Sequence, residues 1–382
     1  MIIQNNRQLA EFCESISSAE ALFIDTEFIG EGRYYPSLGA IQVSLNSEMA
    51  VLIDPLTVTD FQPLSDLLTN DESVKVFHAA SQDLMILNRL FGKPVQNVFD
   101  TQVAYAMISD EEQISFANLV DRTTGIKLAK SHGYSDWLRR PLSKGQIEYA
   151  LDDVKYLALA YDVITNDLRK KDRLNWAEEE FSELSLPQKY AELDPMEVYV
   201  KFKNSDRMPI SILSAIRELA AYRETMARQL NIPVSRIARD EVIQEIARRP
   251  NMTLREMREI RGISQQTVND HGIELLKAAQ SGVNNPVSRV KRNSYLPTSL
   301  EPTVDFLVLC LRSIASELSI ASGLCATRSD LAMLVQYGTE ADIPLMRGWR
   351  KKAIGDTLLA TLQGKATVKI INDSKKVHID WH

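Results

Sequence analysis

The stretch Phe23-Ile-Asp-Thr-Glu-Phe28 ends an apolar run that begins at Ala21. An apolar run of this kind predicts a buried strand. Because side chains on a strand alternate between its two faces, we expect Asp25 and Glu27 to share one face and Thr26 to lie on the other. Two carboxylates on one face repel each other unless a cation lies between them. A solvated strand end is the alternative, and the apolar residues on both sides argue against it.

A second acidic residue, Asp83, occurs in the stretch His78-Ala-Ala-Ser-Gln-Asp83. This stretch follows a predicted strand at 74–77 and leads into a predicted helix at 82–91. The helix dipole favours an acid in the first turn, so Asp83 taken alone is also compatible with a purely structural role. The buried stripe predicted for this helix consists of Leu84, Leu87, Leu90 and Phe91.

A third pair, Tyr149 and Asp153, lies in a helix predicted from Ser143 to Tyr161. Residues four apart are neighbours on one helix face, whereas Asp152 is rotated by about 100° from Asp153. We therefore expect Asp153 to belong to a site and Asp152 to be a surface acid. An amphipathic helix with an ordinary tyrosine is the alternative for this segment alone.

Together, these acids have the composition of a metal site. Four carboxylates in one place offer only oxygen ligands, which Mg²⁺ and Mn²⁺ prefer. Two such ions about 4 Å apart stabilise the attacking and leaving oxygens of a phosphoryl transfer. A tyrosine with an ordinary pKa of about 10 could orient the attacking water but would leave its activation to the metal. The predicted ligands of two Mg²⁺ or Mn²⁺ ions are Asp25, Glu27, Asp83 and Asp153, with Tyr149 beside the attacking water.

The set of motifs resembles the DEDDy subgroup of 3′→5′ exonucleases, and within it the bacterial ribonuclease D family. Gln82 departs from the family pattern, because many relatives have a second acid there, but the neighbouring Asp83 is retained. Further stretches extend the resemblance over essentially the whole chain: Arg33-Tyr-Tyr-Pro-Ser-Leu-Gly-Ala-Ile-Gln42, Phe99-Asp-Thr-Gln102 and Asp136-Trp-Leu-Arg-Arg-Pro-Leu142.

The resemblance implies a metal-dependent 3′→5′ exoribonuclease that releases nucleoside 5′-monophosphates from tRNA precursors and other small structured RNAs. It also implies that Thr26, Phe28 and His78 contact the terminal nucleotide; for His78, a hydrogen-bonded structural histidine is the alternative. Two other functions stay open, a 3′→5′ exodeoxyribonuclease and a catalytically silent RNA-binding protein. The sequence has no polymerase or helicase segment to favour the first, and its intact acid set argues against the second.

Composition and charge narrow the class of protein. The 382 residues predict two to three domains, and no apolar run approaches the ~18 residues of a membrane helix. Three scattered cysteines and the lack of a signal peptide are typical of a cytoplasmic protein, which we expect to be a monomer.

Residues 1–200 hold 17 Lys and Arg against 32 Asp and Glu, a formal charge of −15, whereas residues 201–382 carry +8. The basic half is either a site for the nucleic-acid backbone or a result of compositional drift.

The order of predicted elements gives the fold class and the domains. The predicted fold is a ribonuclease-H-like α/β exonuclease domain with a mixed sheet, built from strands at 21–28, 39–45, 49–53, 74–77 and 97–99 with helices between and after them.

From residue 208 the strand signal stops, and Arg228-Gln-Leu-Asn-Ile-Pro233 resembles part of an HRDC domain, a small all-α bundle. Gly355-x-x-Leu358-Leu359 repeats Gly272-x-x-Leu275-Leu276, so a second, diverged HRDC-like bundle is predicted. The predicted boundaries are 1–170 for the exonuclease domain, 171–207 for a helical connector, 208–285 for the first bundle, 286–302 for a linker, 303–366 for the second bundle and 367–382 for a β-hairpin tail.

Overall fold

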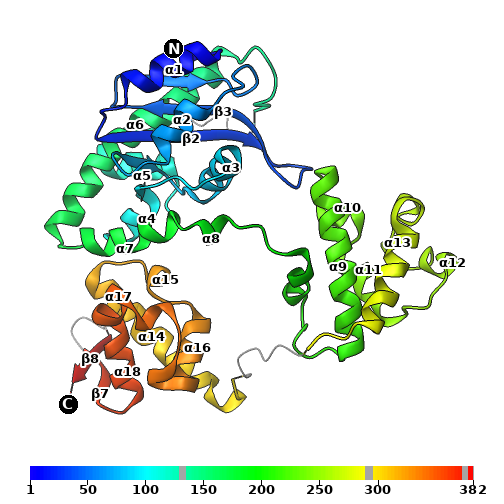
Figure 1. The fold of residues 1–382 in the computed structure, drawn as a ribbon. Helices are drawn as coiled ribbons and strands as arrows, with labels where there is room; N and C mark the ends of the chain where they lie inside the picture. The colour runs from blue at the N-terminus through cyan, green and yellow to red at the C-terminus, as the bar shows by residue number, and fades with distance from the viewer. Residues whose placement is uncertain (129–134, 289–295, 372–376, 382) are drawn as a thin grey trace. The chain divides into compact units, whose positions relative to one another are not determined.

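The computed structural model describes residues 1–128, 135–288, 296–371 and 377–381. They divide into two compact units (Figure 1), each with a hydrophobic core of its own. The first unit contains residues 1–27 and 38–190 together with the described residues from 296 onward, and the second contains residues 28–37 and 191–288.

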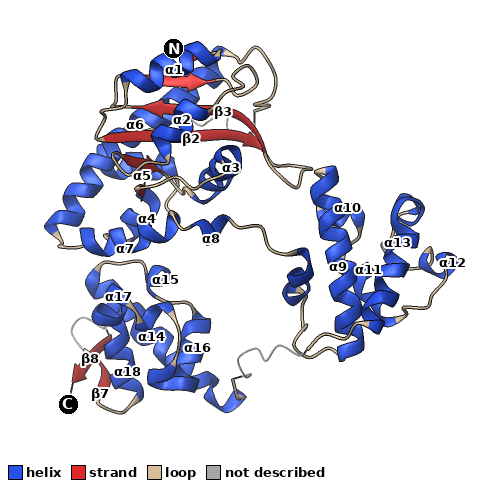
Figure 2. Ribbon diagram, in the orientation of Figure 1, coloured by secondary structure: helices blue, strands red, loops and turns tan. Residues whose placement is uncertain are grey.

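A mixed six-stranded sheet forms the centre of the α/β domain (Figure 2). Its strand order is β1-β4-β3-β2-β5-β6. Strand β3 is antiparallel to β4, whereas β1 is parallel to β4 and β5 is parallel to both β2 and β6. This arrangement confirms the predicted α/β class with a mixed sheet. The strands are β1 (Ile2–Ile3), β2 (Ala21–Ile29), β3 (Ser37–Ser44), β4 (Ala50–Ile53), β5 (Val74–Phe77) and β6 (Val98–Asp100).

Strand β1 has no counterpart among the predicted strands, because two residues are too short to show a period. Backbone hydrogen bonds hold β1 at the edge of the sheet. Leu52 N donates to Met1 O at 3.0 Å, and Asp54 N donates to Ile3 O at 2.9 Å. The other five strands begin and end within two residues of the predicted positions. Their strong apolar content made them visible in the sequence.

Helices of the α/β domain place two of the predicted acids. Helix α3 carries Asp83, and the long helix α6 carries Asp153 and begins with a capping box formed by Ser143 and Gln146. The buried stripe predicted for α3 is wrong at Leu90, which is 37% exposed; Ile86 is buried instead. The helices are α1 (Asn6–Ser15), α2 (Gln62–Leu68), α3 (Ser81–Phe91), α4 (Thr101–Ala106), α5 (Phe116–Thr124), α6 (Lys144–Lys170), α7 (Leu174–Leu184) and α8 (Pro187–Tyr190).

The C-terminal helical region belongs to the same compact unit as the α/β domain, although the sequence predicts an independent bundle. The rings of Trp349 and Trp176 are stacked with their centroids 5.1 Å apart. Trp349 Nε1 and Arg350 Nη2 both donate to the Glu180 carboxylate, at 2.9 and 2.6 Å. These contacts join α7 to the C-terminal region. That region comprises α14 (Glu301–Leu318), α15 (Ser322–Cys325), α16 (Arg328–Tyr337), α17 (Gly348–Arg350), a π-helical turn (Lys351–Gly355), α18 (Asp356–Leu362) and an antiparallel hairpin of β7 (Ala366–Ile370) and β8 (Val377–Trp381), with short 3₁₀ turns at Thr298–Leu300, Gly338–Glu340 and Pro344–Met346.

The first helices of the second unit and of the C-terminal region follow the same order. In both regions a long helix ends at a residue in the left-handed conformation, Asn231 in one and Ser319 in the other, and a four-residue helix follows. Each short helix then ends at an extended alanine, Ala238 or Ala326. The second HRDC-like bundle stays a prediction. The helices of the second unit are a 3₁₀ helix (Pro195–Lys201), α9 (Ile210–Leu230), α10 (Val234–Ile237), α11 (Asp240–Arg248), α12 (Leu254–Met257) and α13 (Gln265–Asn284).

Residues 28–37 belong to the second unit, although the sequence places them inside the exonuclease domain at 1–170. Polar contacts account for the difference. Tyr35 N donates to Asn231 Oδ1 at 2.8 Å, and Arg228 Nε donates to the Tyr34 hydroxyl at 3.2 Å. The Tyr34 hydroxyl in turn donates to Glu224. A contact between residues so far apart in the chain has no signature in local sequence.

Candidate metal centre

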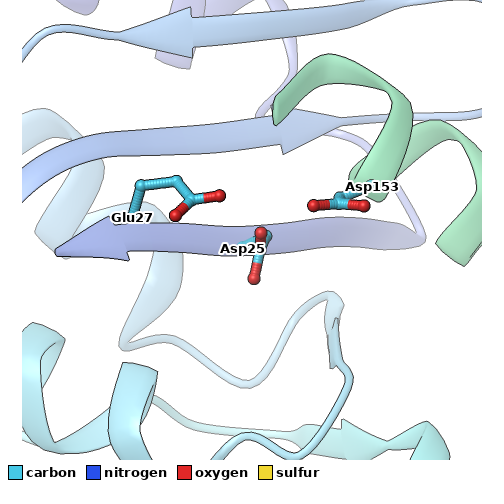
Figure 3. A group of neighbouring side chains, drawn as sticks. All are labelled: Asp25, Glu27 and Asp153. Carbon is cyan, nitrogen blue, oxygen red and sulfur yellow. The ribbon is translucent and has the colours of Figure 1, made fainter. Parts of the chain in front are cut away.

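Strand β2 and helix α6 bring three carboxylates together (Figure 3). Asp25 and Glu27 are two residues apart on β2, and Asp153 lies on α6. One oxygen from each of the three carboxylates lies within 4.8 Å of the others. The alternation expected along the strand therefore places Asp25 and Glu27 as the sequence predicts.

The electrostatics of this group favour a cation. Burial raises the pKa of Asp25 well above its ordinary value, and the negative charges of Asp83, Asp153 and Glu27 raise it further. Burial, followed by the charges of Asp153 and Asp83, raises the pKa of Glu27 to about 8. Mutual repulsion in a low-dielectric site disfavours the ionised forms. A hard divalent cation relieves that repulsion, and this set of oxygen donors fits one.

Asp83 approaches the cluster from α3 but lies outside the group whose ligand atoms are all within 4.8 Å. It is 7% exposed and accepts a hydrogen bond from the hydroxyl of Thr26, the residue between Asp25 and Glu27. Burial raises the pKa of Asp83 to about 6, and the Thr26 bond acts in the opposite direction. Asp83 is thus close enough to raise the pKa of both carboxyls on β2, while its role as a metal ligand stays a prediction. Gln82 is exposed.

Tyr149 is coupled to the cluster through Asp153. The two side chains form a hydrogen bond, which lowers the pKa of Asp153, although burial raises that pKa to about 7 overall. Burial and the surrounding carboxylates raise the pKa of Tyr149 above its ordinary value. Tyr149 therefore keeps its proton at neutral pH and acts as a hydrogen-bond donor. Its ring lies 6.2 Å from that of Trp137, which is 1% exposed and so limits its movement.

The predicted nucleotide contacts Thr26, Phe28 and His78 have different surroundings. The Thr26 hydroxyl is engaged by Asp83. His78 lies 3.1 Å through Nδ1 from Thr101 Oγ1 and 3.1 Å through Nε2 from the Ile114 carbonyl. Burial lowers the pKa of His78, so its ring is neutral. These contacts match the structural alternative for this histidine. Phe28 is half-buried on β2, one residue after Glu27.

Known families match two separate parts of the chain. A family of 3′–5′ exonucleases matches residues 1–169, and the HRDC domain family matches residues 213–278. The ribonuclease D of Sphingobium indicum is 33% identical over 382 residues, which cover 98% of each chain. The ribonuclease D of Zymomonas mobilis is 34% identical over 376 residues, which cover 97% of this chain and 95% of the relative. The chain belongs to the ribonuclease D family.

A solved ribonuclease D has the same overall structure. The crystal structure of Escherichia coli RNase D, an exoribonuclease involved in structured RNA processing, superposes with a TM-score of 0.85 at 26% identity. The superposition covers 95% of this chain and 98% of the E. coli chain. The likeness therefore extends through the helical regions as well as the α/β domain. Among the described residues of this ribonuclease D family member, no helix combines the length and apolar character that a membrane span requires.

Sequence reasoning missed one residue beside the ribonuclease D site. Asp100 is 3% exposed, and its carboxylate accepts hydrogen bonds from the backbone N–H groups of Ala79, Ala80 and Gln102 at 2.9–3.0 Å. It lies within the motif Phe99-Asp-Thr-Gln102, which contributes to the family resemblance but predicts no role for this acid. The sequence signal for this residue is its position directly after the strand predicted at 97–99.

Proposed function

We propose that this protein is a metal-dependent 3′→5′ exoribonuclease that shortens small structured RNAs, including tRNA precursors. The cluster of Asp25, Glu27 and Asp153 carries the proposal, because it gathers three acids in a chain of the ribonuclease D family. The solved E. coli relative is an exoribonuclease involved in structured RNA processing, which supports RNA as the substrate. The proposed active form is a monomer, since one chain supplies all the residues of the site.

The proposed cofactors are two divalent ions, Mg²⁺ or Mn²⁺. Asp25, Glu27 and Asp153 would hold them together with Asp83, which is buried beside the cluster. When bound, the ions stabilise the negative charge on the attacking and leaving oxygens of the phosphodiester. Oxygen-only ligands match the preferences of these cations and not those of zinc or copper.

The protein's own groups orient the reactants. In the proposed reaction, Tyr149 donates its proton to Asp153, and its hydroxyl oxygen accepts a hydrogen bond that orients a water molecule toward the 3′-terminal phosphodiester. Water attack forms a new P–O bond and breaks the bond between phosphorus and the 3′ oxygen of the preceding nucleotide. The products are a nucleoside 5′-monophosphate and an RNA shortened by one nucleotide with a free 3′-hydroxyl. Phe28 is a proposed contact for the terminal base or sugar, because an aromatic side chain can stack on either.

A matched pair of variants tests the proposal. The substrate is a 5′-labelled structured RNA with a 3′ extension, incubated with Mg²⁺, with Mn²⁺ or with EDTA. The unmodified protein should give a descending ladder that requires metal. Asp153→Asn should abolish the ladder while RNA binding, measured by gel shift, persists. Asp152→Asn is the control, because Asp152 is the half-exposed neighbour of Asp153 and pairs with Lys155 at 3.6 Å.

Two outcomes would contradict the proposal in different ways. A ladder on the matching DNA that is faster than on RNA would favour an exodeoxyribonuclease. Binding of RNA without a ladder on either nucleic acid would favour a catalytically silent RNA-binding protein.

A further inference from the structure

The turn between β5 and α3 determines where Asp83 lies. It consists of His78, Ala79 and Ala80, and Asp83 is the third residue of the helix that follows. Ala79 has φ of +56°, in the left-handed region that a non-glycine residue rarely adopts. Helix α3 also has no side-chain cap of its own, since Ala80 occupies the capping position. Something outside the turn must therefore hold it in this conformation.

Asp100 is that group. It faces Phe77 in the parallel pairing of β5 with β6, so the end of one strand lies beside the turn after the other. Its Oδ1 accepts from Ala79 N at 3.0 Å and from Gln102 N at 2.9 Å, and its Oδ2 accepts from Ala80 N at 2.9 Å. One buried carboxylate thus satisfies three backbone donors, two of which belong to the turn.

The next residue holds the turn from the same side. Thr101 Oγ1 donates to the Phe77 carbonyl at 2.9 Å and lies 3.1 Å from His78 Nδ1. Asp100 and Thr101 together therefore contact the last residue of β5 and all three residues of the turn. The helix that follows this turn carries Asp83, whose carboxylate accepts a hydrogen bond from Thr26 on β2.

We propose that Asp100 is a positioning residue for the metal centre: by holding the strained turn at Ala79 and Ala80, it places Asp83 against β2. This inference rests on the proposed metal-dependent function. Asp100 acts through the start of α3, and its negative charge adds to the effect of burial in raising the pKa of Asp83. Partners of this kind, which orient a ligand without binding the metal, commonly change metal affinity by about 10- to 100-fold when removed.

Asp100→Asn is the first variant. Asparagine has the same shape as aspartate, but an NH₂ group replaces one of the two carboxylate oxygens. That NH₂ group would face a backbone N–H, from which it cannot accept a hydrogen bond. Asn5→Ala is the matched control, because Asn5 accepts from Gln8 N at 2.9 Å and caps α1 in the same domain. The measurement is titration of metal-free protein with Mn²⁺ alone, with free Mn²⁺ followed by electron paramagnetic resonance and no RNA present.

The expected result is a Kd for Mn²⁺ about 10-fold higher or more in Asp100→Asn and unchanged in Asn5→Ala. Adding Ala79→Gly to Asp100→Ala should recover part of the lost affinity, because glycine adopts a positive φ without strain. A charge effect of Asp100 on the metal would not be recovered in this way. If Asp100→Asn lacks the near-ultraviolet circular dichroism of the folded protein, Asp100→Glu replaces it, with the same expected direction.

The outcomes separate the two proposals. An unmodified protein that binds no Mn²⁺ overturns the metal-dependent function and, with it, this inference. An unmodified protein that binds Mn²⁺ while a folded Asp100 variant binds it equally well overturns the positioning role alone. Lost affinity that Ala79→Gly does not recover also overturns it, because the turn is then not the route by which Asp100 acts.

Discussion

The hydroxyl of Thr26 donates a hydrogen bond to the carboxylate of Asp83, so the strand that carries Asp25 and Glu27 is joined directly to the helix that carries the remaining acid. Thr26 is the residue between the two acids on this strand. The three successive residues of β2 thus supply two carboxylates to the cluster and one donor to Asp83.

Thr26→Val should weaken the site without unfolding the domain. Valine keeps the branched shape but leaves the buried Asp83 carboxylate without this donor, and hydrogen bonds to charged groups contribute about 1.5–3 kcal/mol. We expect roughly a 10- to 100-fold loss in exonuclease rate at low Mn²⁺, partly restored at high Mn²⁺. Thr26→Ser, which retains the hydroxyl, is the control. Equal rates for the valine and serine variants would contradict the prediction.

Tyr149→Phe should lower the turnover rate even when Mn²⁺ is saturating. Tyr149 is the proposed acceptor of a hydrogen bond from the attacking water, and loss of a positioned group of this type reduces rates by about 10²–10⁴-fold. The measurement is single-turnover hydrolysis together with Mn²⁺ titration. Tyr156→Phe makes the same change elsewhere on α6 and should be close to unmodified protein. A Tyr149→Phe enzyme with a normal rate would remove tyrosine from the mechanism.

Metal-free protein should be less stable at high pH. The pKa of Glu27 is raised to about 8 and that of Asp153 to about 7, so from pH ~4 upward the folded state holds protons that the unfolded state has lost. Stability then falls with rising pH and levels off above about pH 8. The expected loss is on the order of a few kcal/mol. It would be measured by urea unfolding in EDTA between pH 5 and pH 9.

Two comparisons check the cause of this pH effect. Glu27→Gln has no charge to develop at that position, so its stability should fall less across the same range. Adding Mn²⁺ at pH 8 should restore stability, because a ligand that binds only the folded state raises the free energy of unfolding. A metal-free protein that gains stability from pH 5 to pH 8 would show that the acids are not mutually destabilising.

Glu180→Ala should loosen the C-terminal region from α7. Glu180 accepts from both Trp349 Nε1 and the Arg350 guanidinium, and both members of the ion pair are less than 20% exposed. Removing one partner of a largely buried pair costs about 3 kcal/mol. Arg328→Ala, which breaks a solvent-exposed pair with Glu301, should lower stability much less. Thermal unfolding that is equally affected by the two substitutions would contradict the prediction.

Most of the arrangement of the acid cluster can be predicted from local sequence patterns. The strand period puts Asp25 and Glu27 on one face, and the helix period separates Asp153 from Asp152. Both are short-range properties of a single element. The structure adds only that β2 and α6 lie together.

Other features depend on contacts between distant residues and could not be predicted. The role of Asp100 depends on the pairing of β5 with β6, which brings it beside Ala79. The membership of residues 28–37 in the second unit depends on Tyr34 and Tyr35 meeting α9 and Asn231. A tyrosine pair in a loop gives no sign of its partner, since many partners would satisfy the same hydroxyls.

The stacking of Trp176 on Trp349 also sets an order of events during protein synthesis. Trp349 is added to the chain 173 residues after Trp176. At translation rates of about 5–20 residues per second, Trp349 is synthesised roughly 10–35 s after Trp176. During that interval the Trp176 ring lacks the stacking partner that it has in the complete fold. The last quarter of the chain therefore completes the core of a domain whose sheet was synthesised first.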